Sequence, residues 1–371
     1  MKKMNKRINL NEIIINSASA ALKFQNKDGS FPQGHNGPWN SNDTPVRTTS
    51  HWAILLLKAN KLTNDIKFKK SATKAYDYLI SKNARPFDYA FHCINSTKII
   101  MHSNGLIGQA WVIESLIEAY KYLNDSVYLN LAEDLILKHK FNKDLYLWNI
   151  LGLNGEILKL HRTFNQQLWF SIMAFKVVKM CNNNDISLKT DKFFNILPSI
   201  VKFKKFIRMH LKESYNQQKI SLSKRSFTKL KNMLAKTYFL KLSRGYLSFS
   251  LFALSELYKI DQSMSLWKSY RFKKIILESV KYLDDKIFND EKNEFGFQYN
   301  PIGFEVAFIK ERLSKYLGYY SGHSIEEWIL KQLINHYDFK KMMMIKNTSD
   351  QNTLASRIYE LTRLENRLLI I

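Results

Sequence analysis

TTSHWAILLLKAN, residues 48–60, sets the pattern of the chain: a polar run ends in Thr or Ser and passes into an apolar helical run. The pattern returns in GLIGQAWVIESLIEAY (105–120), TFNQQLWFSIMAFKVV (163–178), GYLSFSLFALSELY (245–258), PIGFEVAFIKERL (301–313) and DQNTLASRIYELTRL (350–364). Matching positions lie 59, 58, 82, 55 and 49 residues apart, at Trp52, Trp111, Trp169, Leu251, Val306 and Ala355. Six units of similar length predict one repeated supersecondary element.

The composition favours a single helical body. The chain has 371 residues, of which 45% are hydrophobic and 13% aromatic, enough to bury a large core. Only 12 glycines and 6 prolines occur, which disfavours a fold with many β-turns. We therefore expect one all-α domain over residues 1–371, with a basic excursion at about 204–244.

The net charge of +25 is typical of a protein that meets nucleic acid, anionic lipid or an acidic glycan. The alternative is compositional bias, because Lys, Asn and Ile are all abundant. The sequence has no pattern typical of specific nucleic-acid binding. We expect an acidic oligosaccharide or polysaccharide as the partner, and we keep contact with an anionic membrane open.

The two cysteines, Cys93 and Cys181, form no CxxC pair, so the sequence predicts neither a disulfide framework nor a metal site. We also expect no cofactor. Polar residues interrupt the apolar run at residues 8–25, which indicates a helix and not a signal peptide. No run approaches the roughly 18 apolar residues of a membrane span. These features predict a cytoplasmic protein, with association at the inner face of the membrane as an option.

A second set of amphipathic segments alternates with the six apolar runs. They are predicted at residues 8–25, 66–82, about 126–138, 190–207 with a bend at Pro198, 265–285 and 323–336. The apolar runs are hydrophobic on more of their circumference, so they are expected inside. Six inner and six outer helices predict a closed (α/α)6 barrel, with an open solenoid as the alternative.

The connections are unequal in length. Links from inner to outer helices are short, whereas links from outer to inner helices are long, at 26–47, 83–104, 139–162, 208–244, 287–300 and 337–349. The long links are therefore predicted to emerge together beside the first turns of the inner helices. Long loops on one face of a rigid scaffold are where a binding site is expected.

The first three long links and the helix starts after them carry many side chains that bind hydroxyl groups or stack on a sugar ring. Indole faces suit sugar C–H groups, and amides and guanidinium groups bind hydroxyls and carboxylates. For single residues a helix cap, a core indole or an internal salt bridge is the alternative. The candidate binding residues are Asp28, His35, Trp39, Arg47, Trp52, Asn104, Gln109, Trp111, Glu114, Arg162, Asn165, Gln167 and Trp169.

The remaining links complete the ring of candidates. Tyr299, Asn300, Asp350 and Arg357 are further predicted binding residues, although Asp350 also fits a helix cap. The basic excursion at 204–244 holds apolar residues at helical spacing. It is predicted either to lie on an anionic membrane or to pack, solvated, on the barrel rim.

Across nearly its whole length the chain resembles the AglQ-like family, which is grouped with six-hairpin, (α/α)6-type glycosidases. The resemblance rests on GSFPQGHNGPW, TPVRTTSHW, NGLIGQAWVIE, TFNQQLWF, FQYNPIGFE and DQNTLASRIYELTRL. It implies a hydrolase or isomerase that processes a uronate-containing glycan. The chain departs from the family pattern at Thr48, His161 and Gln166, where Asn, Asp and His are typical. These departures put an acid/base assignment in that loop in doubt.

We hypothesise a carbohydrate-active enzyme of polysaccharide or glycan assembly. Cleavage of a glycosidic bond requires two carboxylates about 5–5.5 Å apart for retention or about 6.5–9.5 Å apart for inversion. Asp43 and Glu305 are predicted as that pair, with Asp28, Glu114 and Asp350 in reserve.

Isomerisation of a uronic acid instead requires a base near the α-proton and cations that stabilise the developing charge. His51 or Tyr299 is predicted as that base, with Arg47 and Arg162 as clamps. A glycan-binding or assembly protein that has lost catalysis on the same barrel is the alternative. Terpenoid and lanthionine cyclases share the barrel type, but the chain lacks a DxDD run and a convincing zinc-ligand set.

Overall fold

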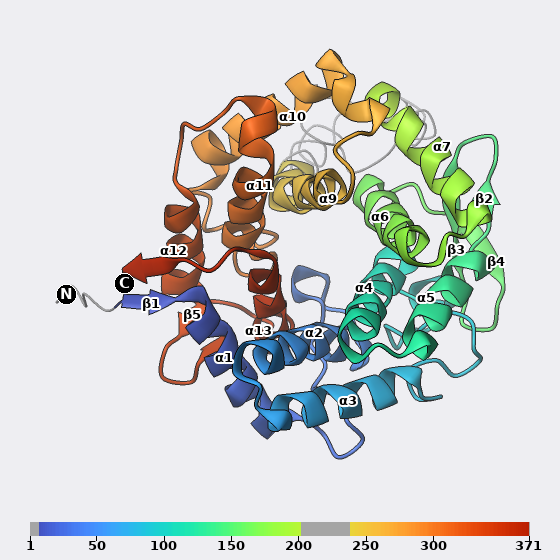
Figure 1. The fold of residues 1–371 in the computed structure, drawn as a ribbon, viewed down its shortest axis with the longest axis horizontal. Coiled ribbons are helices and arrows are strands. Elements are labelled where there is room, and N and C mark those ends of the chain that lie inside the picture. The colour runs from blue at the N-terminus through green and yellow to red at the C-terminus, as the bar shows by residue number, and fades with distance from the viewer. Residues whose placement is uncertain (1–6, 202–237, 371) are drawn as a thin grey trace, which may run out of the picture.

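The computed structural model describes residues 7–201 and 238–370. Helices alternate between an inner and an outer ring around a common centre (Figure 1). The inner ring comprises α2 (Val46–Thr63), α4 (Gly105–Leu123), α6 (Phe164–Cys181), α9 (Leu247–Ile260), α11 (Ile302–Leu317) and α13 (Gln351–Ser356), which continues as the 3-10 helix η7 (Arg357–Arg363). The outer ring comprises α1 (Leu10–Ala21), α3 (Ile66–Ile80), α5 (Ser126–Lys138), α7 (Asn184–Ile200), α10 (Tyr270–Tyr282) and α12 (Ile325–His336).

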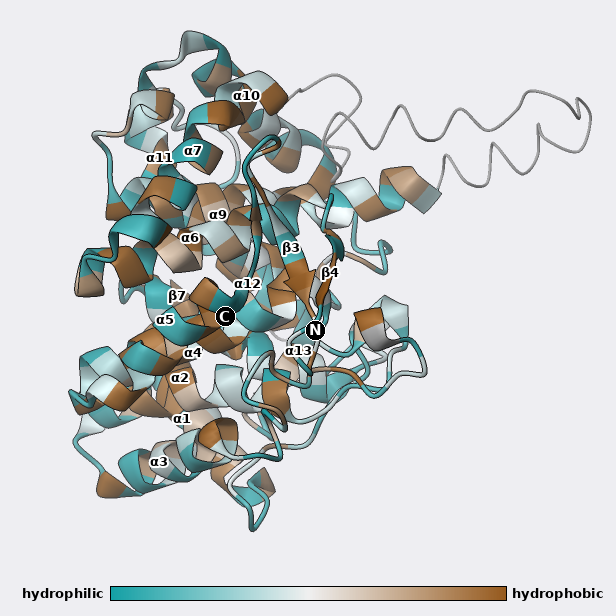
Figure 2. Ribbon diagram, turned by 90° about the vertical axis from the view of Figure 1, so that its right-hand side faces the viewer, coloured by the Kyte–Doolittle hydropathy of each residue, from teal (hydrophilic) through white to brown (hydrophobic). Residues whose placement is uncertain are grey.

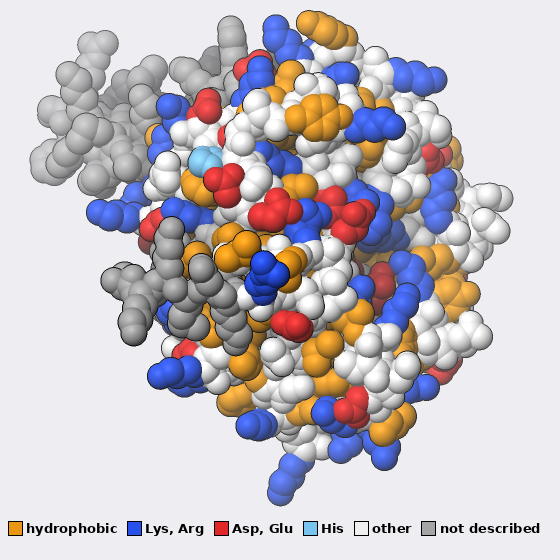
Figure 3. All heavy atoms as spheres, turned by 60° about the vertical axis from the view of Figure 1, so that its left-hand side comes forward, with side chains coloured by type: hydrophobic (Ala, Val, Ile, Leu, Met, Phe, Trp, Pro, Cys, Tyr) orange, Lys and Arg blue, Asp and Glu red, His pale blue; other side chains and the backbone are white. Residues whose placement is uncertain are grey.

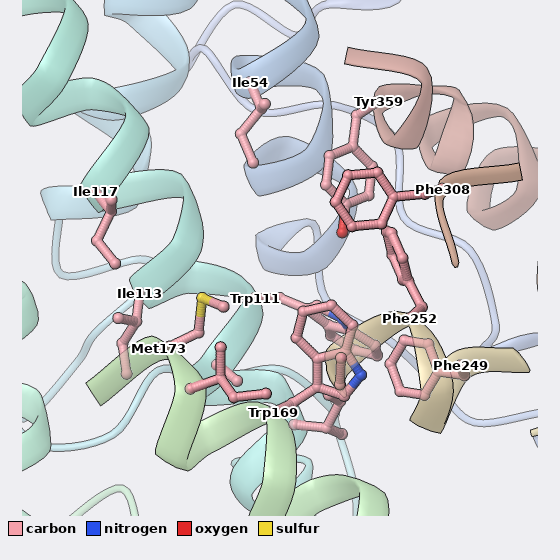
Figure 4. Packing of buried hydrophobic residues seen from close by; sticks show 14 of the residues in the cluster. Ile54, Trp111, Ile113, Ile117, Trp169, Met173, Phe249, Phe252, Phe308 and Tyr359 are labelled. Carbon is pink, nitrogen blue, oxygen red and sulfur yellow. The ribbon is translucent and has the colours of Figure 1, made fainter. Parts of the chain in front are cut away.

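The inner helices are buried on more of their surface than the outer helices, as the hydrophobic pattern predicts. Helix α4 is buried on every side from Gly105 to Ile117. Helix α3 buries mainly one stripe, which includes Phe68, Ala72 and Leu79, and exposes its charged face. Aromatic residues of the inner helices fill the centre (Figure 4): Trp169 lies 5.1 Å from Phe249, measured between ring centroids.

The ring is closed. Each inner helix packs on the next, and η7 returns to contact both α11 and α2. Strand β1 (Arg7–Asn9) pairs in antiparallel register with β7 (Leu368–Ile370), with Ile8 opposite Leu369, so the two ends of the described chain meet. This arrangement confirms the predicted (α/α)6 barrel and excludes the open solenoid.

The short links repeat one turn. Helices α2, α4 and α6 end at Asn64, Asn124 and Asn182, whose φ angles of 56°, 56° and 54° are left-handed. The next residue in each case caps the following outer helix; Asp125, for example, accepts a hydrogen bond of 3.0 Å from the Val127 N–H. Asparagine tolerates the left-handed conformation, and Asp or Asn is a good N-cap, so these two residues suffice for the turn.

The long links carry structure of their own. Residues 139–162, predicted as a loop, contain an antiparallel sheet of β2 (Phe141–Asn142), β3 (Leu147–Leu151) and β4 (Ile157–Leu160). The 337–349 link forms the hairpin of β5 (Tyr337–Asp338) and β6 (Met343–Met344). Figure 2 shows β3, β4 and α13 on the same side of the barrel, as expected for links that meet at the inner-helix N-termini.

Two predicted boundaries were wrong. Helix α7 begins at Asn184 and not at 190, because the Asn183 side chain accepts a hydrogen bond from the Ile186 N–H and caps it. Pro198 lies in its last turn. Residues 238–244, placed in a link, are helical. Most of the predicted basic excursion, 202–237, lies outside the described residues.

No helix in the described part of the chain is both long and apolar enough to cross a membrane. On the face shown in Figure 3, basic side chains are spread over the surface and mixed with acidic ones. Several basic side chains of the described chain form ion pairs: Arg367 lies 2.8 Å from Glu326, for example. The positive charge is therefore not gathered into one patch on this face.

Candidate functional site

Arg47, in the first turn of α2, is the centre of the candidate site. Its guanidinium lies 4.1 Å from the centroid of the Trp111 ring and 5.5 Å from that of Tyr299. Nη1 donates a hydrogen bond of 2.6 Å to Asn36 Oδ1. The side chain is only 2% exposed, yet Nε and Nη2 have no hydrogen-bond partner in the described structure. Nor does Arg47 form an ion pair with any described carboxylate.

His51 follows one turn later on the same helix. Its ring stacks on Tyr359 at 4.3 Å and meets the edge of Trp111 at 5.6 Å, both measured between ring centroids. Nδ1 lies 3.2 Å from Ser356 Oγ, and the buried Nε2 has no hydrogen-bond partner among the described residues. Burial, followed by the positive charges of Arg47 and Arg357, lowers the pKa of His51 well below its usual value. The imidazole is therefore neutral at pH 7.

Helix α6 places two more unpartnered polar atoms at the same end of the barrel. Asn165 Oδ1 and Trp169 Nε1 are buried, and no group in the described part of the chain forms a hydrogen bond with either atom. Trp169 lies at the level of Trp111 on the neighbouring helix α4, as Figure 4 shows. Buried polar groups are nearly always satisfied, so such a cluster indicates a place for a ligand or water.

Asn36 holds Arg47 in place, and the sequence analysis did not single it out. Its backbone is left-handed, with φ of 60°, and its Oδ1 accepts hydrogen bonds of 2.6 Å from both Arg47 and the Tyr299 hydroxyl. The next residue, Gly37, has a φ of 55°, and a Cβ there would lie 2.2 Å from the Tyr299 ring. The Asn-Gly pair in HNGPW was the available signal, because that pair favours left-handed turns.

Asp350 fastens this turn to α13. Its Oδ2 accepts hydrogen bonds of 2.8 Å from the backbone N–H groups of His35 and Gly37, and its Oδ1 accepts one of 3.1 Å from Thr353 N–H. Burial alone would raise the pKa of Asp350, but these hydrogen bonds outweigh it and lower the pKa. Asp350 is thus an ionised helix cap, as the alternative interpretation predicted.

Asp43 lies beside the same turn. It is buried, and its Oδ1 accepts a hydrogen bond of 2.5 Å from Ser41 Oγ. Burial raises its pKa to about 6, against the opposing effect of the Arg47 charge. The carboxyl group can therefore change its protonation state near neutral pH.

Glu305, predicted as the partner of Asp43, has a different set of neighbours. Ser248 Oγ donates to it at 2.5 Å and Arg357 Nη2 at 3.0 Å, while Arg357 also pairs with Glu360 at 2.5 Å. Burial and the Glu360 charge raise the pKa of Glu305 to about 8. Burial beside Glu360 therefore favours the protonated form of Glu305.

Several predicted binding residues have structural roles instead. Gln109 bonds the backbone of Phe91 and Ser103, at 2.8 Å in the shortest cases, and Gln167 bonds that of Trp148. Both amides brace a long link against an inner helix. Asp28 is exposed and forms a local turn with Ser30, 3.0 Å from its N–H.

Other predicted binding residues are buried and also have partners within the protein. Glu114 forms an ion pair with Arg363. Asn300 donates to the Gly245 carbonyl at 2.9 Å and accepts from Arg357 at 3.3 Å. Trp52 packs against Phe31. These residues contribute to the frame around the site.

The remaining predicted residues lie at the rim. Trp39 is 43% exposed and donates through Nε1 to the Tyr246 hydroxyl at 2.7 Å. Asn104 and Arg162 are half-buried. Gln166, where the family pattern has His, accepts hydrogen bonds from Leu106 and Ile107 N–H and so caps α4.

A pocket of about 450 Å³ opens at this rim between the first and last long links. It is lined by Gln33, Gly34, His35, Ser41, Asn42, Ser349, Asp350, Gln351 and Asn352. In the described part of the chain, no three His, Cys, Asp or Glu side chains form a group that could hold a metal ion.

The comparisons with solved structures place the fold among sugar-processing enzymes. The chain is similar to cellobiose 2-epimerase from Bacillus thermoamylovorans, with a TM-score of 0.63, 9% identity and coverage of 95% of this chain and 98% of the other. A D-mannose isomerase is similar with a TM-score of 0.61 and 11% identity, covering 96% of this chain and 97% of the other. An alpha-1,6-mannanase from Salegentibacter sp. is similar with a TM-score of 0.57 and 11% identity, covering 95% of this chain and 98% of the other. At these identities the likeness shows the fold alone.

No family model matches the sequence. A curated relative does: archaeal glycosylation protein Q of Haloferax volcanii is 34% identical over 373 aligned positions, covering 96% of this chain and 98% of the relative. This relationship supports a role connected with glycans. By near-full-length similarity, the chain belongs to the family of archaeal glycosylation protein Q.

Proposed function

We propose that the protein is an enzyme of glycan assembly that acts on a uronic acid residue of an acidic glycan. In the proposed reaction it moves the proton on the carbon beside the carboxylate, as in isomerisation or epimerisation. The observation that carries the proposal is the unpartnered edge of Arg47. The relative's name and the epimerase and isomerase among the fold neighbours agree with it.

The free atoms of Arg47 have the geometry of a carboxylate receptor. Nε and Nη2 lie on the same edge of the guanidinium, the edge that binds a carboxylate with two parallel hydrogen bonds. Nη1 is held by Asn36, and Trp111 supports one face, so the edge has a fixed orientation. A buried cation without a counter-ion costs several kcal/mol, on the order of the penalty for breaking a buried pair. An anionic ligand removes that cost.

His51 is the proposed base. It is four residues after Arg47, so both side chains lie on one face of α2, against the same Trp111 ring. The C–H bond beside the carboxylate breaks, its proton moves to the free Nε2, and its electron pair delocalises into the carboxylate held by Arg47. Return of a proton to the carbon restores the uronate, with inversion if it arrives on the opposite face.

The loop that carries Asn36 must move for a glycan to enter. Arg47 and His51 are 2% and 0% exposed, and Asn36 bonds Arg47 directly. Such a movement would break the contacts that hold this loop: Asp350 at His35 and Gly37, Tyr246 at Trp39, Tyr299 at Asn36, and Asn352 at Gln33.

Glycoside hydrolysis is a second candidate, favoured by the separated pKa values of Asp43, about 6, and Glu305, about 8. It requires both carboxyl groups to flank one glycosidic bond. Their different neighbours, Arg47 for one and Arg357 with Ser248 for the other, make it the weaker candidate.

The test is hydrogen exchange in D2O. Purified protein is incubated with uronate-containing oligosaccharides, and products are read by mass spectrometry and proton NMR. We expect one deuterium to enter at the carbon beside the carboxylate, and His51→Gln to abolish the exchange while retaining glycan binding. Shortened products without exchange would favour hydrolysis, lost in Glu305→Gln. Binding with neither outcome would reject the enzyme and favour the non-catalytic alternative.

A further inference from the structure

We propose that the rim pocket is a second subsite, which binds a neutral, hydroxyl-rich sugar linked to the uronate at Arg47. This inference rests on the proposed function and narrows its substrate to a mixed glycan in which a uronic acid neighbours a neutral sugar. The pocket is separate from the buried layer around Arg47, and its volume of about 450 Å³ lies within the usual range for ligand sites.

Two links from opposite ends of the sequence build the walls. Asn352 Nδ2 donates to the Gln33 carbonyl at 2.9 Å, and His35 Nε2 lies 3.0 Å from the Ser349 carbonyl. These contacts join the two walls when the loop is in its described position, although the segments are more than 300 residues apart in sequence.

The pocket adjoins the Arg47 layer at two points. His35, in the wall, directly precedes Asn36, which holds Arg47. Ser41, also in the wall, donates to Asp43, whose carboxyl group feels the Arg47 charge. A sugar bonded to a uronate at Arg47 would therefore extend toward this pocket.

The wall chemistry suits hydroxyl groups. The side-chain amides of Gln33, Asn42 and Gln351 form no hydrogen bond with another described residue, and Ser349 adds a hydroxyl. Each free amide offers both donors and an acceptor, which matches a hydroxyl that donates and accepts. No aromatic ring other than His35 lines the described pocket, so hydrogen bonds and not stacking would hold the sugar.

The charges around the pocket disfavour a second uronate. Asp350 is ionised, and Asp43 lies behind Ser41. His35 supplies the opposing charge: its two ring nitrogens each face a carbonyl oxygen, at 3.2 Å and 3.0 Å, which only the doubly protonated ring satisfies. Once a uronate has neutralised Arg47, two carboxyl groups against one imidazolium leave no excess positive charge for a second anionic sugar.

The experiment compares three probes by isothermal titration with the full-length protein: a free hexuronate, aldobiouronic acids in which hexuronate is linked to a neutral hexose, and a dihexuronate. The inference expects an aldobiouronic acid to bind about tenfold more tightly than the hexuronate, since two added hydrogen bonds contribute about that much. The dihexuronate should show no such gain.

Variants of the pocket-lining amides test whether the tighter binding of the aldobiouronic acid depends on this pocket. In Gln351→Ala and Asn42→Ala, the ratio of aldobiouronate to hexuronate affinity should fall at least threefold, whereas Gln262→Ala, an exposed amide in a short link, should leave the ratio unchanged. Hexuronate binding without any gain, or an equal gain from the dihexuronate, would overturn the subsite and leave the proposed function standing. Absence of hexuronate binding would overturn both.

Discussion

Arg47 carries a buried positive charge that no carboxylate in residues 7–201 and 238–370 neutralises by contact. Other buried arginines of the barrel are paired: Arg357 meets Glu305 and Glu360, and Arg363 meets Glu256 at 3.1 Å. The difference separates two kinds of residue that look alike in the sequence. Paired arginines stabilise the ring, and the unpaired Arg47 is the residue that we propose binds an anionic ligand.

Glu305 gives a pH dependence to stability. Its pKa is about 8 in the folded protein and near 4.5 when unfolded, so folding favours the protonated form. The contribution of Glu305 to the free energy of unfolding is complete below about pH 4.5 and is lost as the pH rises through about 8. Asp43, with a pKa of about 6, acts in the same direction at lower pH.

We therefore expect Glu305→Gln to flatten the decline in unfolding free energy between pH 5 and 8, because the amide stays neutral. Urea unfolding at a series of pH values measures this slope. Arg357 keeps Glu360 as a partner, so the variant should fold. Equal slopes for wild type and variant would show that Glu305 is ionised in the native protein.

At this scale the sequence identifies types of side chain better than their partners. Arg47, His51 and Trp111 were predicted from their position at helix starts, and the structure brings them together. Gln109 and Gln167 have the same position but turn back to their own links, because backbone N–H and C=O groups there needed partners. Asn36 was missed because its role depends on Tyr299, more than 260 residues away.

The elements of the barrel are joined by the repeated turn at Asn64, Asn124 and Asn182. We expect Asn124→Ala to lower the free energy of unfolding by about 1–2 kcal/mol, because alanine is strained at a φ of 56°. Asn124→Gly should change it much less. Chemical denaturation measures both.

Asn130→Ala in the exposed face of α5 serves as the control and should be neutral or slightly stabilising. If the alanine and glycine variants at Asn124 were equally stable, the left-handed conformation would not be what the turn requires.

Element types were predictable where the periodic hydrophobic pattern extends over several helical turns. All twelve ring helices follow from it, and the starts of the six outer helices are set by side-chain caps such as Asn183. The strands of the 139–162 link were not predicted, because β2 has two residues and β4 alternates without a strongly apolar face. Such short strands depend on the links being held beside one another, which only the barrel provides.

The closed ring directs the starts of the inner helices to one end of the barrel. Arg47 of α2, Asn165 of α6 and Glu305 of α11 therefore lie at the same end, and all three are buried. The six repeated units predicted that closure, although the pairing of β1 with β7 that joins the ends was not foreseen. The family resemblance was confirmed by the glycosylation relative.

The central claim is that Arg47 receives a uronate, and one titration series tests it most directly. Hexuronate and the matching neutral hexose are titrated into wild-type protein, Arg47→Lys and the control Arg312→Lys. Lysine keeps the positive charge but cannot bind a carboxylate with two parallel hydrogen bonds. We predict that wild type and the control prefer the hexuronate and that Arg47→Lys binds it at least tenfold more weakly. Equal binding of both sugars, or an unchanged Arg47→Lys, would contradict the account.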